Sequence, residues 1–117
     1  MQYILMAYVE EGGWTKLTKA EQEQGVAAYQ AYIEAMAKAG ILISHNRLQP
    51  SSAAMTVQIA NGKQRVLDGP YAESKEQLGG YFVIDVPDAD AAISWAVRCP
   101  AASHGIVEVR PLWVMPA

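Results

Sequence analysis

The sequence has little of several features that would place it in a specialised class of protein. It contains one cysteine, Cys99, among 117 residues, so it cannot form an internal disulfide, and this fits a reducing compartment. No apolar run approaches the roughly 20 residues needed to cross a bilayer. The N-terminus has no basic segment before its short apolar run, unlike a signal peptide. We therefore expect a cytoplasmic protein with no membrane partner.

Charge is also sparse. Charged residues make up 18% of the chain, the net charge is −3, and no window clusters lysine or arginine. Binding of nucleic acid through phosphate contacts is therefore not expected. The only histidines, His45 and His104, stand in no motif with metal-ligand spacing, and two isolated histidines with one cysteine make a poor metal set. Gly79-Gly80 does not match a phosphate-binding loop. We expect neither a metal nor a cofactor.

The chain does have enough apolar residues, 51%, to fold around one core, and we expect a single domain over residues 1–117. A capping box at Thr18 and Glu21 predicts a helix start, Gly40 predicts a left-handed helix end, and Asn61-Gly62 predicts a tight hairpin. Helical faces are predicted at Val26, Tyr29, Ile33, Met36 and Ala37, and at Ala92, Ile93, Ala96 and Cys99. The expected elements are a strand over 2–9, a loop over 12–17, a helix over 18–39, a strand from 41, a strand over 55–59, a strand over 63–67, a connecting loop over 68–80, a strand over 81–86, a helix over 88–99 and a strand over 106–110.

This order predicts an α+β fold of the ferredoxin-like β-α-β-β-α-β type with an extra hairpin strand. Right-handed crossovers place both helices on one face of an antiparallel four-stranded sheet. The first strand, however, is apolar on both faces, with Tyr3, Leu5 and Ala7 on one and Ile4, Met6 and Tyr8 on the other. Two helices cannot cover both faces of such a sheet. We therefore predict a symmetric homodimer packed sheet to sheet.

The nine residues Asp68 to Glu76, with the sequence DGPYAESKE, resemble the signature of the DGPFAETKE group of the YCII-related family. They differ from it at Tyr71 and Ser74, and three further segments are similar to other motifs of the group: 77–81, 98–102 and 107–111. The resemblance implies a dimeric α+β barrel of ferredoxin-like subunits. It implies no assigned reaction. Some members of the group are encoded beside, or fused to, extracytoplasmic-function sigma factors, which implies a regulatory role as one alternative.

The broader family is similar to muconolactone-isomerase-like barrels, and the resemblance would imply a catalytic His–Asp pair with its histidine near the first helix. The predicted helix over residues 19–39 contains no histidine. The pair therefore has no counterpart there in this chain.

The segment from Asp68 to Glu76 is the densest cluster of ionisable groups. In the functional interpretation, Asp68 or Glu73 moves a proton and is the catalytic candidate, while Lys75 neutralises an anionic ligand beside Glu76. In the structural interpretation, the segment is a turn in which Asp68 bonds to the backbone two residues on. The glycines at 79–80 would permit close approach of either a ligand or a neighbouring strand.

Two further places could contribute to a ligand site. Glu108 and Arg110 project to the same face as Ile106, either as a polar floor inside the barrel or as an ion pair with Asp85 or another neighbour. The aromatic residues that border loops, Tyr8, Trp14 and Tyr71, would lie at a cleft. His45 and His104 are expected at the surface, Cys99 is expected to be buried, and Ser103-His104 is not expected to form a triad.

Two functions fit these observations. In the first, the chain is a small-molecule-binding homodimer, and it could be a cofactor-free enzyme that transfers a proton or isomerises a small polar compound. The proposed ligand-binding residues are Tyr8, Tyr71, Lys75, Glu76, Glu108 and Arg110. In the second, it is a non-catalytic dimeric interaction or regulatory module linked to sigma-factor-controlled transcription.

Overall fold

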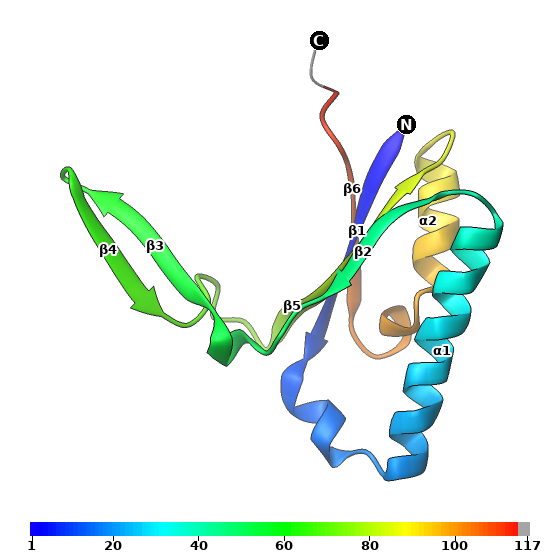
Figure 1. The fold of residues 1–117 in the computed structure, drawn as a ribbon, viewed down its shortest axis with the longest axis horizontal. Coiled ribbons are helices and arrows are strands. Elements are labelled where there is room, and N and C mark those ends of the chain that lie inside the picture. Colours follow the sequence, from blue (N-terminus) through cyan, green and yellow to red (C-terminus); the bar gives the residue numbers. More distant parts are fainter. Residues whose placement is uncertain (115–117) are drawn as a thin grey trace.

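A computed structural model, which describes residues 1–114, shows a four-stranded antiparallel sheet, two helices on one of its faces, and a separate two-stranded hairpin (Figure 1). Three short 3₁₀ helices connect these parts. The elements are β1 (Gln2–Glu10), η1 (Glu11–Lys16), α1 (Lys19–Lys38), β2 (Leu42–Arg47), η2 (Ser51–Ala53), β3 (Met55–Ala60), β4 (Lys63–Asp68), β5 (Glu76–Asp85), α2 (Ala89–Arg98), η3 (Pro100–Ser103) and β6 (Ile106–Pro111).

The strands of the main sheet lie in the order β2-β5-β1-β6. Because β1 and β5 occupy the centre and α1 and α2 connect them to the edge strands β2 and β6, the fold is ferredoxin-like, as predicted. The hairpin β3–β4 is an insertion between β2 and β5. It pairs with no strand of the main sheet.

Local signals in the sequence set the ends of α1. The hydroxyl of Thr18 accepts a hydrogen bond from the Glu21 amide (3.1 Å), and the Thr18 amide donates to the Glu21 carboxylate (2.9 Å). This capping box lowers the pKa of Glu21 from its ordinary value, chiefly through the backbone hydrogen bond from Thr18. At the other end Gly40 adopts φ = 73°, the left-handed conformation predicted for it.

The core lies between the helices and one face of the sheet. Leu5 of β1, Met36 of α1 and Ile84 of β5 are completely buried there. Tyr32 of α1 packs edge-on against Phe82 of β5, with ring centroids 5.2 Å apart. The remaining core residues are Tyr3, Ala7, Val86, Ala92, Ala96, Cys99 and Ala101. Burial raises the pKa of the Cys99 thiol, as expected for a thiol in apolar surroundings.

The predicted helical faces need three corrections, the first of which is that Ala37 of α1 is exposed. Ile93 does not face the core but is 51% exposed, because Ala92, Ala96 and Cys99 form the inner row and Ile93 lies one step around α2 from it. Val26 is also exposed, at the N-terminal half of α1, where the helix extends past the sheet (Figure 1). Tyr32, by contrast, was not part of the predicted face of this helix, but it is buried in the centre of the core.

Two predicted boundaries are also wrong. The segment expected as a loop over 12–17 is largely the 3₁₀ helix η1, and β5 begins at Glu76 rather than at Tyr81. Gly79 and Gly80 therefore lie inside a strand. A Cβ on Gly80 would lie 2.9 Å from the Asn46 carbonyl oxygen of β2. Of the two alternatives, a ligand or a neighbouring strand, the glycines therefore permit the close approach of neighbouring strands.

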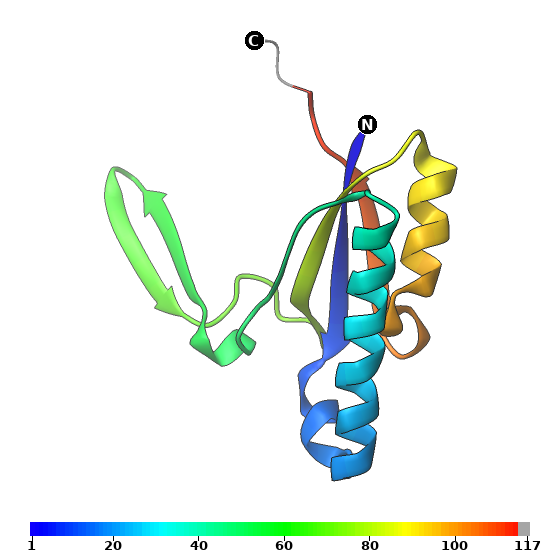
Figure 2. The ribbon, with the colours of Figure 1, turned by 45° about the vertical axis from the view of Figure 1, so that its right-hand side comes forward.

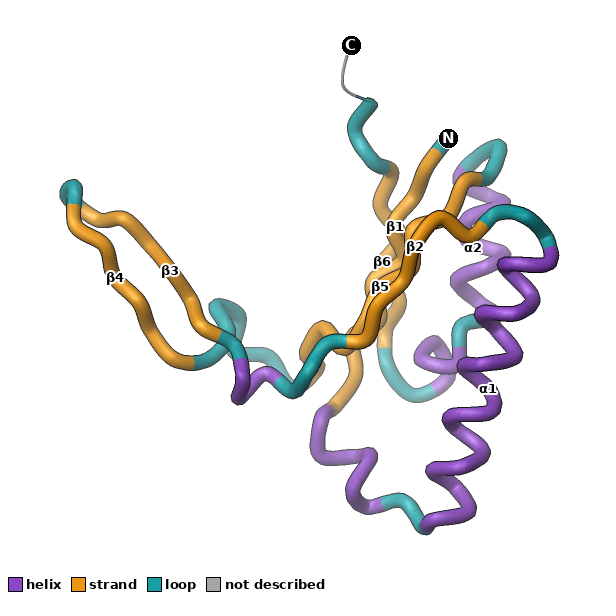
Figure 3. The backbone as a smooth tube through the Cα atoms, in the orientation of Figure 1, coloured by secondary structure: helices purple, strands orange, loops and turns teal. Residues whose placement is uncertain are grey.

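The hairpin β3–β4 forms as predicted. Asn61 (φ = 51°) and Gly62 (φ = 75°) provide the two left-handed residues of its turn, and Val57 lies opposite Val66. We call residues 55–68 the arm and the two segments that join it to the body, 48–54 and 69–75, the neck (Figure 3). The arm projects from the sheet on the side away from the helices, a direction that both views show (Figures 1 and 2).

The arm makes the chain much less compact than its length requires. The radius of gyration is 16.4 Å, whereas about 13 Å is typical of a domain of this length. The accessible surface is 8486 Å², whereas a folded monomer of this mass exposes about 6,200 Å². The chain therefore exposes an excess of surface, on the order of 2,200 Å² by the same scaling.

The start of β6 gives the first testable prediction. A Cβ on Gly105 would overlap the Tyr8 carbonyl oxygen of β1 and would lie 3.3 Å from the Ala101 carbonyl oxygen. Gly105→Ala should therefore lower the free energy of unfolding by about 1–3 kcal/mol, measured by urea denaturation. Gly12→Ala is the control, because a Cβ there meets nothing within 4 Å, and it should stay within about 0.5 kcal/mol of the parent. Equal unfolding midpoints for the two variants would contradict this packing.

Candidate functional site

One face of the main sheet has no helix over it (Figures 1 and 2). Strand pairing and the alternation of side chains determine which residues project from it. We call this surface the open face. Its residues are Ile4, Met6, Tyr8 and Glu10 on β1; Ser44 and Asn46 on β2; Glu76, Leu78, Tyr81 and Val83 on β5; and Ile106, Glu108 and Arg110 on β6. None of them is fully buried, although many are apolar.

Polar side chains cross the middle of the open face. Met6 of β1 lies opposite Tyr81 on one side and Glu108 on the other. The Asn46 amide donates a hydrogen bond to the Tyr81 hydroxyl over 2.8 Å. Since that hydroxyl accepts from Asn46, its own proton is left to donate to another group.

An ion pair continues this row along β6. The Arg110 guanidinium donates to the Glu108 carboxylate over 3.1 Å, and both side chains are partly exposed. Arg110 therefore pairs within its own strand and not with Asp85, which instead binds the Met1 amino group at 2.9 Å. Near the other end of the face, the Tyr8 hydroxyl has one partner within residues 1–114, the Met6 sulfur at 4.0 Å. The row thus offers hydroxyl and guanidinium donors and one carboxylate acceptor on an apolar floor.

The structure brings five of the eight predicted site residues to this face or its edge. Tyr8, Glu76, Glu108 and Arg110 project from it, and Glu76 lies directly opposite Glu10 at the end nearest the neck. The Lys75 ammonium lies 3.7 Å from the Glu10 carboxylate, in an exposed pair. Such exposed pairs contribute little stability, so Lys75 remains able to reach an anion.

The other three residues are held elsewhere in the same chain. Asp68 ends β4 on the arm, and Glu73 and Tyr71 lie in the neck, where Tyr71 is 91% exposed. Within residues 1–114 the Asp68 carboxylate accepts no hydrogen bond and forms no ion pair, so it is not the turn cap that the structural interpretation predicted. The backbone of its neighbour Gly69 is what secures the turn.

The neck is fastened by its backbone groups. The Gly69 amide donates to the Ala54 carbonyl over 2.7 Å, and the Thr56 hydroxyl donates to the Gly69 carbonyl over 2.8 Å. The side-chain amide of Gln77 donates to the Ala72 and Ser74 carbonyls, at 2.9 and 3.0 Å. On the other side of the neck, the Glu11 carboxylate accepts from the Ser51 amide and hydroxyl. These bonds tie the arm's base to η1 and β5.

Asn46 and Tyr81 are site residues that the sequence analysis did not select. Tyr81 projects from the open face because it lies opposite Met6, but no signal in the sequence indicates its hydrogen bond with Asn46. Asn46 could not be placed because an irregularity between Leu42 and Ser44 shifts the register of β2. Alternation counted from the strand's start puts Asn46 on the wrong face.

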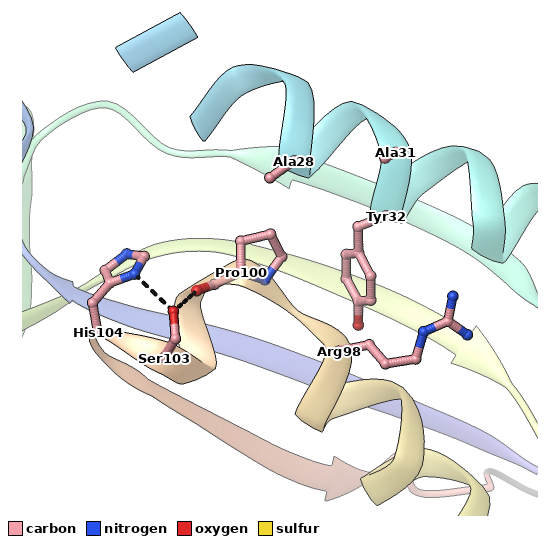
Figure 4. Close-up of a pocket in the computed structure, with 7 residues that line it drawn as sticks. All are labelled: Ala28, Ala31, Tyr32, Arg98, Pro100, Ser103 and His104. Carbon is pink, nitrogen blue, oxygen red and sulfur yellow. Dashed lines mark hydrogen bonds between the residues drawn. The ribbon is translucent and has the colours of Figure 1, made fainter. Parts of the chain in front are cut away.

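A hollow of about 500 Å³ lies on the helical side of the sheet, between α1 and η3 (Figure 4). The Ser103 hydroxyl lies 3.4 Å from His104 Nδ1 but donates to the Pro100 carbonyl at 2.9 Å. The lining residues are Ala28, Ala31, Tyr32, Arg98, Pro100, Ser103 and His104. Because they include no carboxylate to orient the imidazole, they do not form a catalytic triad.

Tyr32 and Arg98 in this hollow serve the helices. The Tyr32 hydroxyl donates to the Trp95 carbonyl over 2.7 Å, one of the last carbonyls of α2, which have no partner within the helix. The Arg98 guanidinium lies 4.2 Å from the centre of the Trp95 ring. Burial raises the pKa of Tyr32 above its ordinary range and that of nearby Tyr29 to about 12, so both phenols stay protonated.

Residues 1–114 contain neither a candidate metal-binding cluster nor a candidate membrane-spanning helix. No cluster of three or more histidine, cysteine, aspartate or glutamate side chains there could hold a metal ion. In the same part of the chain, no helix has the length and apolar character that a membrane crossing requires.

The sequence of this chain matches a known protein family. The model of the YCII-related domain matches residues 1–116. An uncharacterised protein of Rhizobium meliloti (strain 1021), R00369, is 37% identical over 114 residues, which cover 96% of this chain and 92% of that protein.

A solved structure shares the fold. It is TftG, a 5-chloro-2-hydroxyhydroquinone dehydrochlorinase from Burkholderia phenoliruptrix AC1100, in complex with 2,5-dihydroxybenzoquinone. The TM-score is 0.55 at 14% identity, over 97% of this chain and 94% of TftG. At this identity the likeness supports the ferredoxin-like α+β fold.

The contact between Tyr32 and α2 can be tested by removing one oxygen atom. Tyr32→Phe should lower the free energy of unfolding by about 1–3 kcal/mol, because the Trp95 carbonyl loses its partner in a part-buried place. Tyr71→Phe removes the same atom from an exposed side chain and should change stability by less than about 0.5 kcal/mol. Chemical denaturation compares the two, and an unaffected Tyr32→Phe protein would contradict a stabilising role for this hydrogen bond.

Proposed function

The chain belongs to the YCII-related family, and we propose that it is a homodimer that binds a small polar compound on the open face of its sheet. One observation supports this most: a row of hydrogen-bonding groups lies across an apolar sheet face that its own helices leave uncovered. Apolar pockets with a few placed polar groups are the usual form of small-molecule sites.

The chemistry of the row favours a flat, oxygen-substituted ring. Met6, Ile4 and Val83 supply an apolar floor for such a ring, and the Tyr81 hydroxyl and Arg110 guanidinium can donate to its oxygens. The two ring compounds named for TftG, a chlorinated hydroxyhydroquinone and a dihydroxybenzoquinone, have this form. They support the same class of ligand here.

The reaction that these groups favour is proton transfer or isomerisation without a cofactor. The Glu108 carboxylate can accept a proton from a ring or its substituent, and Arg110, 3.1 Å away, can stabilise the enolate-like anion that results. Asp68 and Glu73 remain the further acids that we propose for this step. Because both lie off the open face of their own chain, they would act at an edge of the site, with Tyr71, Lys75 and Glu76.

The open face also supports the proposed homodimer, because its apolar residues are uncovered. A second copy would cover the apolar floor on both chains at once, as the self-complementary contact of a two-fold dimer requires. The excess surface of about 2,200 Å² per chain, estimated above from size scaling, is in the range that stable dimers bury.

A non-catalytic interaction or regulatory module is the second candidate. The observation that favours it is the neck, where backbone and amide groups of residues 69–77 are used to hold the arm. In that case the open face would only join the two copies, and no small molecule would bind to it.

A thermal-shift screen separates the two functions. We expect a panel of hydroxylated ring compounds, including 2,5-dihydroxybenzoquinone, to contain one that raises the melting temperature. A ligand at a hundred times its dissociation constant adds about 2.7 kcal/mol of stability. Glu108→Gln should weaken that ligand at least about tenfold, the loss of one charge-assisted hydrogen bond, while it costs under about 1 kcal/mol of stability because its ion pair is exposed.

The matched control is Glu34→Gln, the same change at an exposed site on α1, behind the sheet. It should leave binding unaltered. A folded dimer that responds to no compound, or a ligand bound equally by the Glu108 and Glu34 variants, would favour the interaction module.

A further inference from the structure

One face of the arm is mainly apolar, with Gln64 at its tip end and Asp68 at its base, and the other face is mainly polar. Met55, Val57 and Ile59 alternate along β3, and Val57 lies directly opposite Val66, so these four side chains project together. The opposite face carries Thr56, Gln58, Lys63, Arg65 and Leu67. We call the first set the apolar face of the arm.

No part of residues 1–114 covers this apolar face. The exposed fractions of Met55, Val57, Ile59 and Val66 are 70, 64, 75 and 50%. An isolated two-stranded hairpin is at best marginally stable in water and needs further strands or a helix against its apolar side. The arm therefore requires a partner surface.

The direction of the arm determines which partner can reach it. It leaves the sheet at the neck and extends on the side of the open face, away from α1 and α2 (Figure 2). Stacked sheets lie about 10 Å apart, whereas a six-residue strand alone extends about 20 Å. A second sheet stacked on the open face would thus lie within the reach of the arm.

Charge favours a second copy of this chain as that partner. The arm carries Lys63 and Arg65 near its tip and Asp68 at its base, a net charge of +1. Since the whole chain has a net charge of −3, the remainder carries −4. A basic arm tip and an acidic body attract each other when the arm of one chain reaches the body of another.

Asp68 lies on the apolar face, at its base, opposite Met55. Its carboxylate accepts no hydrogen bond from residues 1–114. Whatever surface covers Met55 and Val57 will therefore also meet this carboxylate. An unpaired carboxylate inside a contact is costly unless the other side supplies a donor, such as the hydroxyls and the guanidinium of the open face.

On the basis of the homodimer and the site proposed above, we propose that the arm is exchanged between two copies and completes the partner's site. The apolar face of each arm packs against the other chain, and Asp68 reaches the edge of that chain's open face. Each ligand site then combines the floor of one chain with a carboxylate of the other. This accounts for a signature segment in which two of the three acids, Asp68 and Glu73, lie away from the open face of their own chain.

Photo-crosslinking tests the exchange without a ligand. The photoreactive residue p-benzoylphenylalanine replaces Val57 in one protein, Asp68 in a second and, as the control, Gln58, which projects from the polar face next to Val57. After irradiation at micromolar concentration, position 57 should give at least about five times more covalent dimer than position 58. Crosslinks from position 68 should map by mass spectrometry to open-face residues of the other chain.

A matched pair of variants gives an independent measurement. Val57→Asp should raise the dimer dissociation constant at least about a hundredfold, because it places a charge in the apolar contact. Gln58→Asp adds the same charge opposite Arg65 and should leave the constant within about threefold. Circular dichroism establishes that both variants keep the fold, and sedimentation measures dimerisation.

The outcomes distinguish this proposal from the proposed function. Equal crosslinking at positions 57 and 58, crosslinks from 68 that stay within one chain, or a folded Val57→Asp protein that dimerises like the parent would each overturn arm exchange. Neither readout involves a ligand, so small-molecule binding could still hold after any of these results. Conversely, an exchanged arm in a protein that binds no compound would overturn the ligand site and leave the exchange intact.

Discussion

The structure depends on how two helices pack against a four-stranded sheet. Leu5 and Ile84, from the two central strands, are fully buried against Met36 of α1, and Tyr32 links the helices by binding the Trp95 carbonyl. Two helices are enough to cover one face of such a sheet, and they leave the other in contact with solvent. Apolar side chains on that second face are costly to expose, at about 25 cal/mol for each Å².

The open face and the arm both expose apolar side chains to solvent, and both would be stabilised if another surface covered them. They also lie on the same side of the sheet (Figure 2). A second copy, as proposed above, would cover both surfaces at once and would enclose the row formed by Asn46, Tyr81, Glu108 and Arg110. In this account dimerisation and ligand binding depend on the same surface, and the arm connects one chain's signature to the other chain's site.

The sequence predicted those features that depend on short-range chemistry. Thr18, Gly40 and Asn61 each determine a cap or turn through contacts a few residues away, so the element order and the ferredoxin-like fold followed. The face of Glu108 followed from alternation alone. The distance between Asp68 and the open face could not be predicted, because it depends on the direction in which a long insertion leaves the sheet.

Hydrogen exchange of the arm tests the central claim most directly. The account predicts that the backbone amides of residues 55–68, which pair only within the hairpin, become protected as the protein concentration rises and a dimer of twice 12.7 kDa forms. Partial dilution below the dissociation constant should return them to fast exchange. Fast exchange at every concentration, with a mass that stays at 12.7 kDa, would show that no second copy covers the arm and would contradict the account.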